Sequence, residues 1–389
     1  MSFIMNIRSV AKYESKILVR SWFFRIFTLL AVVFLGFFNF AMMLMEDNFG
    51  LWFAKSVSSN IPYLNLLLLN TGQAVVAVFL SSEFLKRDKK LDTSEVFYVR
   101  PLSNAEYVVG KIWGNLRVFL FLNLLVLAIV LAFNFMASGV TVDLPAYLVY
   151  FFLISIPTLI FIIGLSIFLM LLLKNQALTF ILLLGYIGLT LFYIQDKFYY
   201  LFDYMVYNLP LFKSTIVGFS NLELILNHRA IYFFAGLGFI FFTIFLFKRL
   251  PNARRSHYPW LFLSFCMFLL MVTAGFRHVR SILWEGEMRA LYTSINNKYV
   301  YEPKMAIDYY DISVEQKSET IRSVVGMEGT ALAASEVFIF CLNPGLRVEE
   351  VKDGEKSLNF KREEQILAVD FGRKIEKGDT ISFSVSYEG

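Results

Sequence analysis

The chain has 389 residues, of which 57% are hydrophobic and 17% are charged, and its formal net charge is +5. A soluble globular protein is nearer to a quarter charged, so this composition excludes a wholly water-soluble chain. The apolar excess lies before Arg277, and the rest has an ordinary soluble composition. We therefore expect one unit in lipid and one in water. The modest net charge gives no indication of nucleic-acid binding.

The first segment, 1–21, predicts an amphipathic helix. Its apolar residues follow helical spacing, and Arg8, Lys12, Lys16 and Arg20 take the other side. Such a helix lies flat on an anionic membrane surface. Because the following apolar run has no cleavage site after a short core, we expect the segment to be retained. Two roles remain open, a simple anchor and a more specific contact.

Seven apolar stretches are long enough to cross a bilayer, which takes about 20 residues. They cover 22–45, 61–84, 114–136, 146–173, 177–194, 231–247 and 259–277. Only three residues, 174–176, separate the fourth from the fifth, which predicts a tight helical hairpin. The composition therefore predicts a membrane all-α bundle of about seven transmembrane helices.

Basic residues predict the orientation, because they are enriched in cytoplasmic loops. They gather in the N-terminal segment and in the loops after the second and sixth stretches. Acidic residues such as Asp143, Asp196 and Asp203 fall on the other side. We therefore expect a cytoplasmic N-terminus. Arg277, His278 and Arg280 oppose this rule, since they follow the seventh stretch on the predicted outer side.

The predicted cytoplasmic loop 85–112 contains two helix starts. Asp92 with Glu95 and Ser103 with Glu106 have the spacing of capping boxes. Pro101 disfavours helix at Arg100, so the first helix is short, and the second continues into the third span. A short charged helix at the membrane surface can dock into a cytoplasmic partner. The alternative is an ordinary solvated connection.

The order of residues in this loop resembles the first cytoplasmic loop of permease subunits of type-2 ABC exporters. The matching residues are Glu83, Arg87, Asp92, Thr93, Glu95, Arg100, Pro101, Ser103, Gly110 and Lys111. The flat basic helix and a six-helix domain over 22–249 also resemble that family. So does an outer polar-aromatic segment, 195–229, where the family has short re-entrant helices.

This resemblance implies a multi-pass protein of the bacterial cytoplasmic membrane that exports a substrate. It implies two partners: a cytoplasmic ABC ATPase subunit that binds ATP and Mg, and a second permease subunit in a homo- or heterodimer. The chain itself has no P-loop, so we expect no directly bound cofactor and no enzymatic activity of its own.

Polar residues inside the predicted spans are candidates for a substrate path, because such residues tend to face protein or water. They are Asn65, Asn70, Gln73, Asn123, Thr179 and Thr190. The resemblance implies that the second and fifth helices line a path at a dimer interface. The other interpretation is hydrogen bonding between helices.

The C-terminal part, 285–389, changes to a period of two. Predicted strands cover 306–314, 319–325, 336–342, 346–351, 365–371 and 381–387, with Gly-containing turns between several of them. This spacing predicts an antiparallel β-sandwich. The seventh span would place it outside the cytoplasm.

The end of the chain resembles the N-terminal sandwich of gluzincin aminopeptidases. The matching residues are Leu342, Asn343, Pro344, Val348, Val351, Gly354, Leu358, Phe360, Arg362, Leu367, Gly378, Tyr387 and Gly389. The catalytic HExxH motif is absent, as is any CxxC pair, so the resemblance implies a fold without hydrolase activity or a metal site. Cys266 lies in an apolar stretch expected in lipid and Cys341 in a strand expected in water, so we expect no disulfide between them.

Three functions follow in order of preference. The first is the transmembrane subunit of an ATP-driven ABC exporter. The second is the membrane-anchoring part of a cell-envelope metallopeptidase or its inactive relative, which an HExxH motif beyond residue 389 would favour. The third is a structural or sensory membrane protein without transport.

Overall fold

The computed structural model describes residues 3–44, 57–90, 102–136, 141–211, 213–214, 218–219, 221–247, 258–317 and 320–389, with backbone only at 44 and 82–90. The chain divides into two compact units, Met1–Ser281 and Ile282–Gly389. Each is described by itself below.

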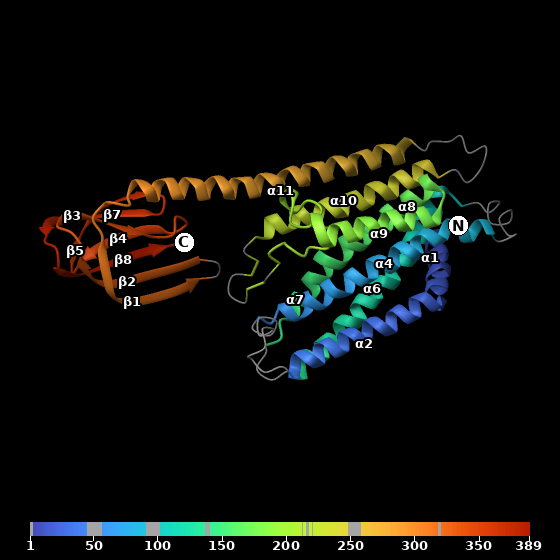
Figure 1. Cartoon of the computed structure of the whole chain (residues 1–389), viewed down its shortest axis with the longest axis horizontal. Coiled ribbons are helices and arrows are strands. Elements are labelled where there is room, and N and C mark those ends of the chain that lie inside the picture. The colour runs from blue at the N-terminus through green and yellow to red at the C-terminus, as the bar shows by residue number, and fades with distance from the viewer. Residues whose placement is uncertain are drawn as a thin grey trace. The chain divides into compact units, whose positions relative to one another are not determined.

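The first unit is helical (Figure 1). Its described helices are α1 (Phe3–Arg20), α2 (Trp22–Leu44), α4 (Asn60–Lys90), α6 (Asn104–Met136), α7 (Leu144–Tyr150), α8 (Ile156–Leu173), α9 (Gln176–Leu189), α10 (Leu222–Leu246) and α11 (Tyr258–Lys298). Two π-helical turns, η1 (Phe151–Ser155) and η2 (Thr190–Ile194), continue α7 and α9, and η3 (Phe198–Tyr200) is a short 3-10 turn. Within the described ranges, seven helical segments are long and apolar enough to cross a membrane, as predicted. The chain is a multi-pass membrane protein.

Helices α10 and α11 extend well beyond the predicted spans. Helix α10 begins at Leu222, nine residues before the predicted boundary at 231. Helix α6 begins at Asn104, ten residues before the apolar run, as the capping box predicted at Ser103 implies. Helix α11 continues through charged residues to Lys298. The predicted hairpin between α8 and α9 is confirmed. Lys174 takes a left-handed conformation (φ 54°) at the end of α8, and the Asn175 side chain accepts a hydrogen bond from Leu178 N at 3.2 Å.

The helices differ in how much of their apolar surface the chain itself covers. Within the apolar window of α4, 67% of residues are buried, against 17% in α2, 22% in α9–η2 and 11% in α11. Helix α4 is therefore central, and α2, α9 and α11 expose apolar side chains as helices in contact with lipid do.

Helices α8 and α10 approach each other closely at two glycines. A Cβ atom added to Gly236 would lie 2.7 Å from the backbone of Ile160, and one added to Gly164 would lie 2.6 Å from Gly236 O. Small residues permit such backbone contact between membrane helices, where dispersion and hydrogen bonding replace the hydrophobic effect.

The second unit consists of the end of α11 and antiparallel strands. They are β1 (Met305–Lys317), β2 (Thr320–Ala331), β3 (Ser335–Cys341), β4 (Arg347–Asp353), β5 (Lys356–Ser357), β6 (Asn359–Glu363), β7 (Ile366–Ile375) and β8 (Thr380–Glu388). They form one sheet in the order β1-β2-β8-β4-β5 and another in the order β3-β7-β6. The six predicted strands correspond to β1–β4, β7 and β8, and the short β5 and β6 were not predicted.

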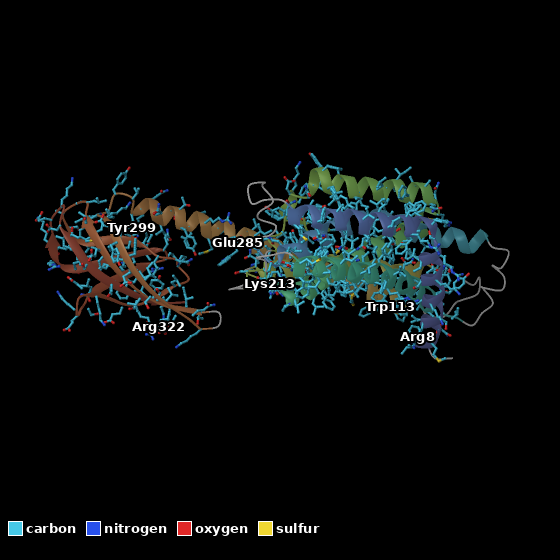
Figure 2. All side chains as sticks on the ribbon, turned by 90° about the horizontal axis from the view of Figure 1, so that it is seen from below. Arg8, Trp113, Lys213, Glu285, Tyr299 and Arg322 are labelled. Carbon is cyan, nitrogen blue, oxygen red and sulfur yellow. The ribbon has the colours of Figure 1, made fainter. Side chains whose placement is uncertain are left out.

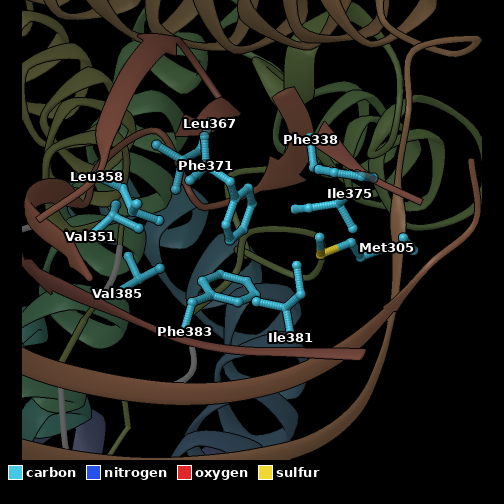
Figure 3. Close-up of a cluster of buried hydrophobic side chains, with 12 residues drawn as sticks. Met305, Phe338, Val351, Leu358, Leu367, Phe371, Ile375, Ile381, Phe383 and Val385 are labelled. Atoms are coloured by element: carbon cyan, nitrogen blue, oxygen red, sulfur yellow. The ribbon is translucent and has the colours of Figure 1, made fainter. Parts of the chain in front are cut away.

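Side chains from both sheets share one apolar core (Figure 3). Phe338 and Phe371 come from the smaller sheet and Phe383 from the larger one, and the rings of Phe371 and Phe383 meet edge to face at 5.5 Å. Val351, Val369 and Val385 belong to the same cluster, so the apolar residues that alternate along the strands are buried between the two sheets.

The last turns of α11 cover the other face of the smaller sheet. Ile295 packs with Ile339 and Ile366 in a second apolar cluster. Tyr299 Oη donates to Glu363 Oε2 at 2.5 Å, and Lys298 Nζ lies 2.9 Å from the same carboxylate. These contacts hold the pKa of Glu363 below its usual value, and the Tyr299 hydrogen bond has the largest effect. The end of α11 therefore belongs structurally to the β domain.

We expect Gly236→Ala to destabilise the helical unit by about 1–3 kcal/mol, because the methyl group meets backbone that cannot move without separating α8 from α10. The measurement is thermal unfolding in detergent. Gly185→Ala in α9 is the matched control, since no described atom lies within 4 Å of its added Cβ. Equal melting temperatures for the two variants would contradict this account of the α8–α10 contact.

Candidate functional site

The segments predicted to be cytoplasmic meet at one end of the helical unit. The Asn6 amide of α1 donates to Glu106 Oε1 of α6 at 2.8 Å. The Asn104 amide donates to the carbonyl of Phe247, just after α10, at 2.6 Å, and the Tyr107 ring stacks on Phe247 at 5.4 Å. The N-terminal helix, the start of α6 and the end of α10 therefore form one junction.

The opposite end carries segments that the sequence predicts to be on the outer side. Lys213 Nζ contacts the Asp143 carboxylate at 2.5 Å, and Ser59 Oγ donates to Lys213 O at 2.9 Å. Figure 2 places Arg8 and Lys213 at opposite ends of the helical unit. The N-terminal helix and the Lys213–Asp143 pair therefore lie at opposite ends of the helical unit.

The predicted capping box at Ser103 is confirmed. Glu106 N donates to Ser103 Oγ at 3.2 Å, and Ser103 N donates to Glu106 Oε2 at 2.6 Å. This reciprocal pair satisfies backbone donors that a helix start leaves free. Because Glu106 also binds Asn6, the same carboxylate fixes both the end of the loop and the position of α1.

Helix α1 packs along the first turns of α6 with backbone proximity. A Cβ atom on Gly110 would lie 2.7 Å from Val10 Cβ, and one on Gly114 would lie 2.9 Å from Ala11 O. Ser15 Oγ donates to Gly114 O at 2.6 Å, and Arg117 Nη2 donates to Ala11 O at 2.8 Å. These hydrogen bonds fix the register of the two helices.

A buried ion pair lies inside this contact. Lys111 Nζ is 3.3 Å from Glu14 Oε2, and their side chains are 4% and 3% exposed. The resemblance assigned Lys111 to the loop that faces the ATPase, but the structure places its ammonium group against α1. Sequence analysis missed Glu14, although an acidic residue on an otherwise basic amphipathic helix was a usable signal.

The two faces of α1 separate its roles. Ala11, Glu14, Ser15 and Leu18 are buried against the protein, and Arg8, Lys12, Lys16 and Arg20 are exposed. Of the two roles left open, the packed face favours a specific contact, and the exposed basic face remains available for an anionic surface.

The remaining residues of the predicted coupling loop are described only in part. The backbone of Glu83 and Arg87 lies in the last turns of α4. Asp92, Thr93, Glu95, Arg100 and Pro101 lie outside the described residues.

Three of the six predicted path residues are brought together between the helices, where they bind one another. Gln73 Nε2 donates to Asn70 Oδ1 at 2.6 Å, and Asn123 Nδ2 donates to Gln73 Oε1 at 2.9 Å. Asn70 Nδ2 closes the ring on Asn123 Oδ1 at 3.2 Å, and Ser155, which was not predicted, donates to the same oxygen at 2.8 Å. All four are buried, and the ring joins α4, α6 and η1.

The other path residues lie outside this ring. Asn65 and Asn39 exchange hydrogen bonds between α4 and α2 at 2.7 and 3.1 Å. Thr179 donates to Asn175 O in the first turn of α9, and Thr190 is buried where η2 begins. In this conformation the amides make interhelical hydrogen bonds, as the second interpretation expects.

A buried arginine, Arg229, joins the segment 195–229 to the neighbouring helices. Pro157 has no N–H to donate to Leu153 O, which is four residues earlier. Arg229 Nε donates to that carbonyl at 2.7 Å, and Arg229 Nη2 donates to Thr158 Oγ1 at 2.8 Å. Arg229 Nη1 also donates to Tyr204 O at 3.0 Å. The predicted start of the sixth span at residue 231 puts Arg229 in the outer segment, whereas in the structure Arg229 belongs to α10.

Asp203 supplies negative charge near this arginine. Its side chain is fully buried, and Oδ2 accepts from Asn208 N at 2.8 Å. Burial raises the pKa of the Asp203 carboxyl, while nearby backbone N–H groups and then Arg229 act in the opposite direction. The outer segment is thereby folded back onto the helices.

The same segment contains a left-handed turn that two histidines hold. Phe198, Tyr199 and Tyr200 have φ of 52°, 59° and 62°, a conformation costly for non-glycine residues. His278 Nε2 donates to Tyr199 O at 2.9 Å, and His228 Nε2 donates to Tyr200 O at 3.0 Å. Between η2 and α10, the described residues contain this turn and no helix longer than it, whereas the family resemblance implied short re-entrant helices there.

The basic residues that opposed the predicted orientation have partners here. Arg277 Nη2 contacts Glu223 Oε1 of α10 at 2.8 Å, and His278 binds the turn. Two members of the cluster are therefore used in contacts within the unit.

No protein-family model matches the chain, and no curated protein matches it either.

We expect Lys111→Met to destabilise the protein by about 3–5 kcal/mol, because the Glu14 carboxylate stays buried without its partner. The double variant Glu14→Gln, Lys111→Met should recover most of that loss. Thermal unfolding and the rate of tryptic cleavage at the basic face of α1 provide the measurements. If the double variant is no more stable than the single one, the ion pair does not hold α1.

A double-mutant cycle tests the role of Arg229. Arg229→Met should lower the free energy of unfolding by about 3–5 kcal/mol, since Asp203 loses a nearby positive charge and several buried carbonyls lose their donor. In a Pro157→Ala background the new N–H can bind Leu153 O, so the loss should shrink by about 1 kcal/mol. Arg277→Met, an exposed ion-pair partner, is the control and should cost at most about 1 kcal/mol. Strict additivity of Arg229→Met and Pro157→Ala would exclude the proposed link.

Proposed function

We propose that this chain is the transmembrane subunit of an ATP-driven ABC exporter in a bacterial cytoplasmic membrane. The observation that carries the proposal is the junction of α1 with the capped start of α6. A loop that ends at a fixed cap beside a buried ion pair can pass a displacement to two helices at once. That is the mechanical requirement for a subunit driven from the cytoplasm.

The path of the displacement follows from the contacts. Movement of the loop would act on Glu106, which binds both Ser103 and Asn6. From there α6 leads to Asn123 in the ring of buried amides. A change at the cap would therefore reach the core of the bundle along one continuous helix, whereas α1 would move with it because of its close packing.

The energy source in this proposal is a separate cytoplasmic ATPase subunit that binds ATP and Mg. The basic end of the helical unit, including the exposed face of α1, is the cytoplasmic side. The second permease subunit would pack on helices whose apolar side chains this chain leaves exposed, such as α2 and α9. The transport path would then open when Asn70, Gln73 and Asn123 exchange their mutual hydrogen bonds for bonds to substrate.

The β domain in this proposal is a sandwich on the extracytoplasmic side. Its two antiparallel sheets with a shared core support the sandwich, and the extracytoplasmic side follows from the proposed topology. Three residues that carry the aminopeptidase resemblance are also in contact. Arg362 Nη2 donates hydrogen bonds to the carbonyls of Leu342 and Asn343 at 2.9 and 2.7 Å. This contact supports the aminopeptidase-like fold and carries no catalytic group. The second candidate function is the membrane-anchoring part of a cell-envelope metallopeptidase or its inactive relative. Chelator-sensitive aminopeptidase activity in the native complex would support that function instead.

The transport proposal is tested by purifying the tagged full chain from native membranes. We expect a P-loop ATPase to copurify and its ATP hydrolysis to depend on this subunit. Asp92→Lys with Glu95→Lys should lower the copurified ATPase at least about tenfold, since about 1.4 kcal/mol of lost binding produces that change. Glu355→Lys with Lys377→Glu in the β domain is the control and should leave it unchanged. Wild-type protein that carries no ATPase would overturn the proposal.

A further inference from the structure

The β domain contains an apolar cavity of about 420 Å³ between its two sheets. Its floor is the inner face of the larger sheet, with Ile312, Val325 and Val385, and its wall is the edge strand β3, with Phe340 and Cys341. This volume falls within the range of about 300–1,000 Å³ that is usual for small-molecule sites.

A β-bulge builds the floor. The register of β1 against β2 shifts between Ile307 and Tyr309. As a result Tyr310 lies opposite Met327 and Ile312 lies opposite Val325, so these side chains share the inner face. Without the extra residue, the alternation along β1 would turn Tyr310 and Ile312 to the outer face.

The smaller sheet leaves part of this floor uncovered. Val325 is only 6% exposed, but Tyr310 and Ile312 are 53% and 57% exposed. The fold therefore places large apolar side chains on an inner face, and the described residues of the domain leave about half of their surface uncovered.

The lining defines the chemistry of an occupant. Apart from two tyrosines, Cys341 and Lys304, the lining side chains are all apolar, and it contains no carboxylate. Lys304 is exposed and is the only charged lining residue, so it provides a cation next to an apolar volume. Met305 and Met327 supply flexible walls that adapt to a chain of variable shape.

A peptide strand fits this site less well than an apolar chain. A strand would need the free backbone edge of β3, but Ile339 N in the middle of that edge already donates to Pro303 O at 3.0 Å. An unbranched hydrocarbon chain needs no such hydrogen bonds.

We propose that this cavity binds a single-chain anionic amphiphile of the fatty-acid class, with the hydrocarbon chain on Ile312 and Val325 and the anionic head at Lys304. The site does not depend on the transport proposal, since all its residues lie in the β domain.

The test uses the full chain in nanodiscs of neutral phospholipid, with Cys266→Ser so that Cys341 is the reporter thiol. Cys341 is exposed at the cavity. At a dodecanoate concentration about ten times Kd, maleimide labelling of Cys341 should slow about tenfold. Dodecyltrimethylammonium should protect much less, and Lys304→Glu should reverse that preference. An anionic lysophospholipid in a parallel arm distinguishes a free acid from a lipid as the source.

Ile312→Gln should abolish the protection, and Val324→Gln is its matched control. Val324 is a 48% exposed apolar residue on the same hairpin but on the outer face, where it lies opposite Ser313 and Ser386. Labelling that no amphiphile slows would overturn the proposal. So would equal loss of protection in both glutamine variants, or equal protection by the anionic and cationic amphiphiles.

Discussion

The helical unit depends on one constraint, that a backbone or side-chain polar group inside the bilayer must find its partner within the protein. Pro157 creates the sharpest case, because it leaves Leu153 O without its helical donor. Arg229 fills that gap from α10 and at the same time binds Thr158 and Tyr204 O. One guanidinium thus links α8, α10 and the outer segment, and Asp203 offsets its charge.

The buried amides obey the same rule. Asn70, Gln73 and Asn123 satisfy one another across α4 and α6, and Asn39 and Asn65 do so across α2 and α4. Such a ring is stable when every member is paired and costly when one leaves. A substrate that supplied equivalent hydrogen bonds would lower this cost, which is how a structural network and a transport path can use the same residues.

The junction at the basic end shows how function could be added to a stable bundle. Close packing at Gly110 and Gly114 makes α1 and α6 move together, and the cap at Ser103 fixes the point at which the loop ends and α6 begins. The β domain is a separate unit with its own core and its own cavity. The proposed activities of the two units can therefore be tested independently.

The sequence alone determined the number of long apolar helices, the helical hairpin at 174–176, the cap at Ser103 and most strands of the β domain. These features depend on local apolar periodicity and on side chains within a few residues of the backbone groups that they bind. Tertiary structure alone decided that Lys111 pairs with Glu14, that Arg229 replaces the donor missing at Pro157, and that Asn123 belongs to a ring with Ser155. It also decided that β6, whose residues Lys361, Arg362 and Glu363 gave no alternating apolar pattern, pairs at a sheet edge. For the three polar contacts the partner lies far away in the chain, and a polar residue in a sequence carries no record of which distant group will satisfy it. Strand β6 pairs with the adjacent β7, and it was missed because its sequence lacks the alternating apolar pattern.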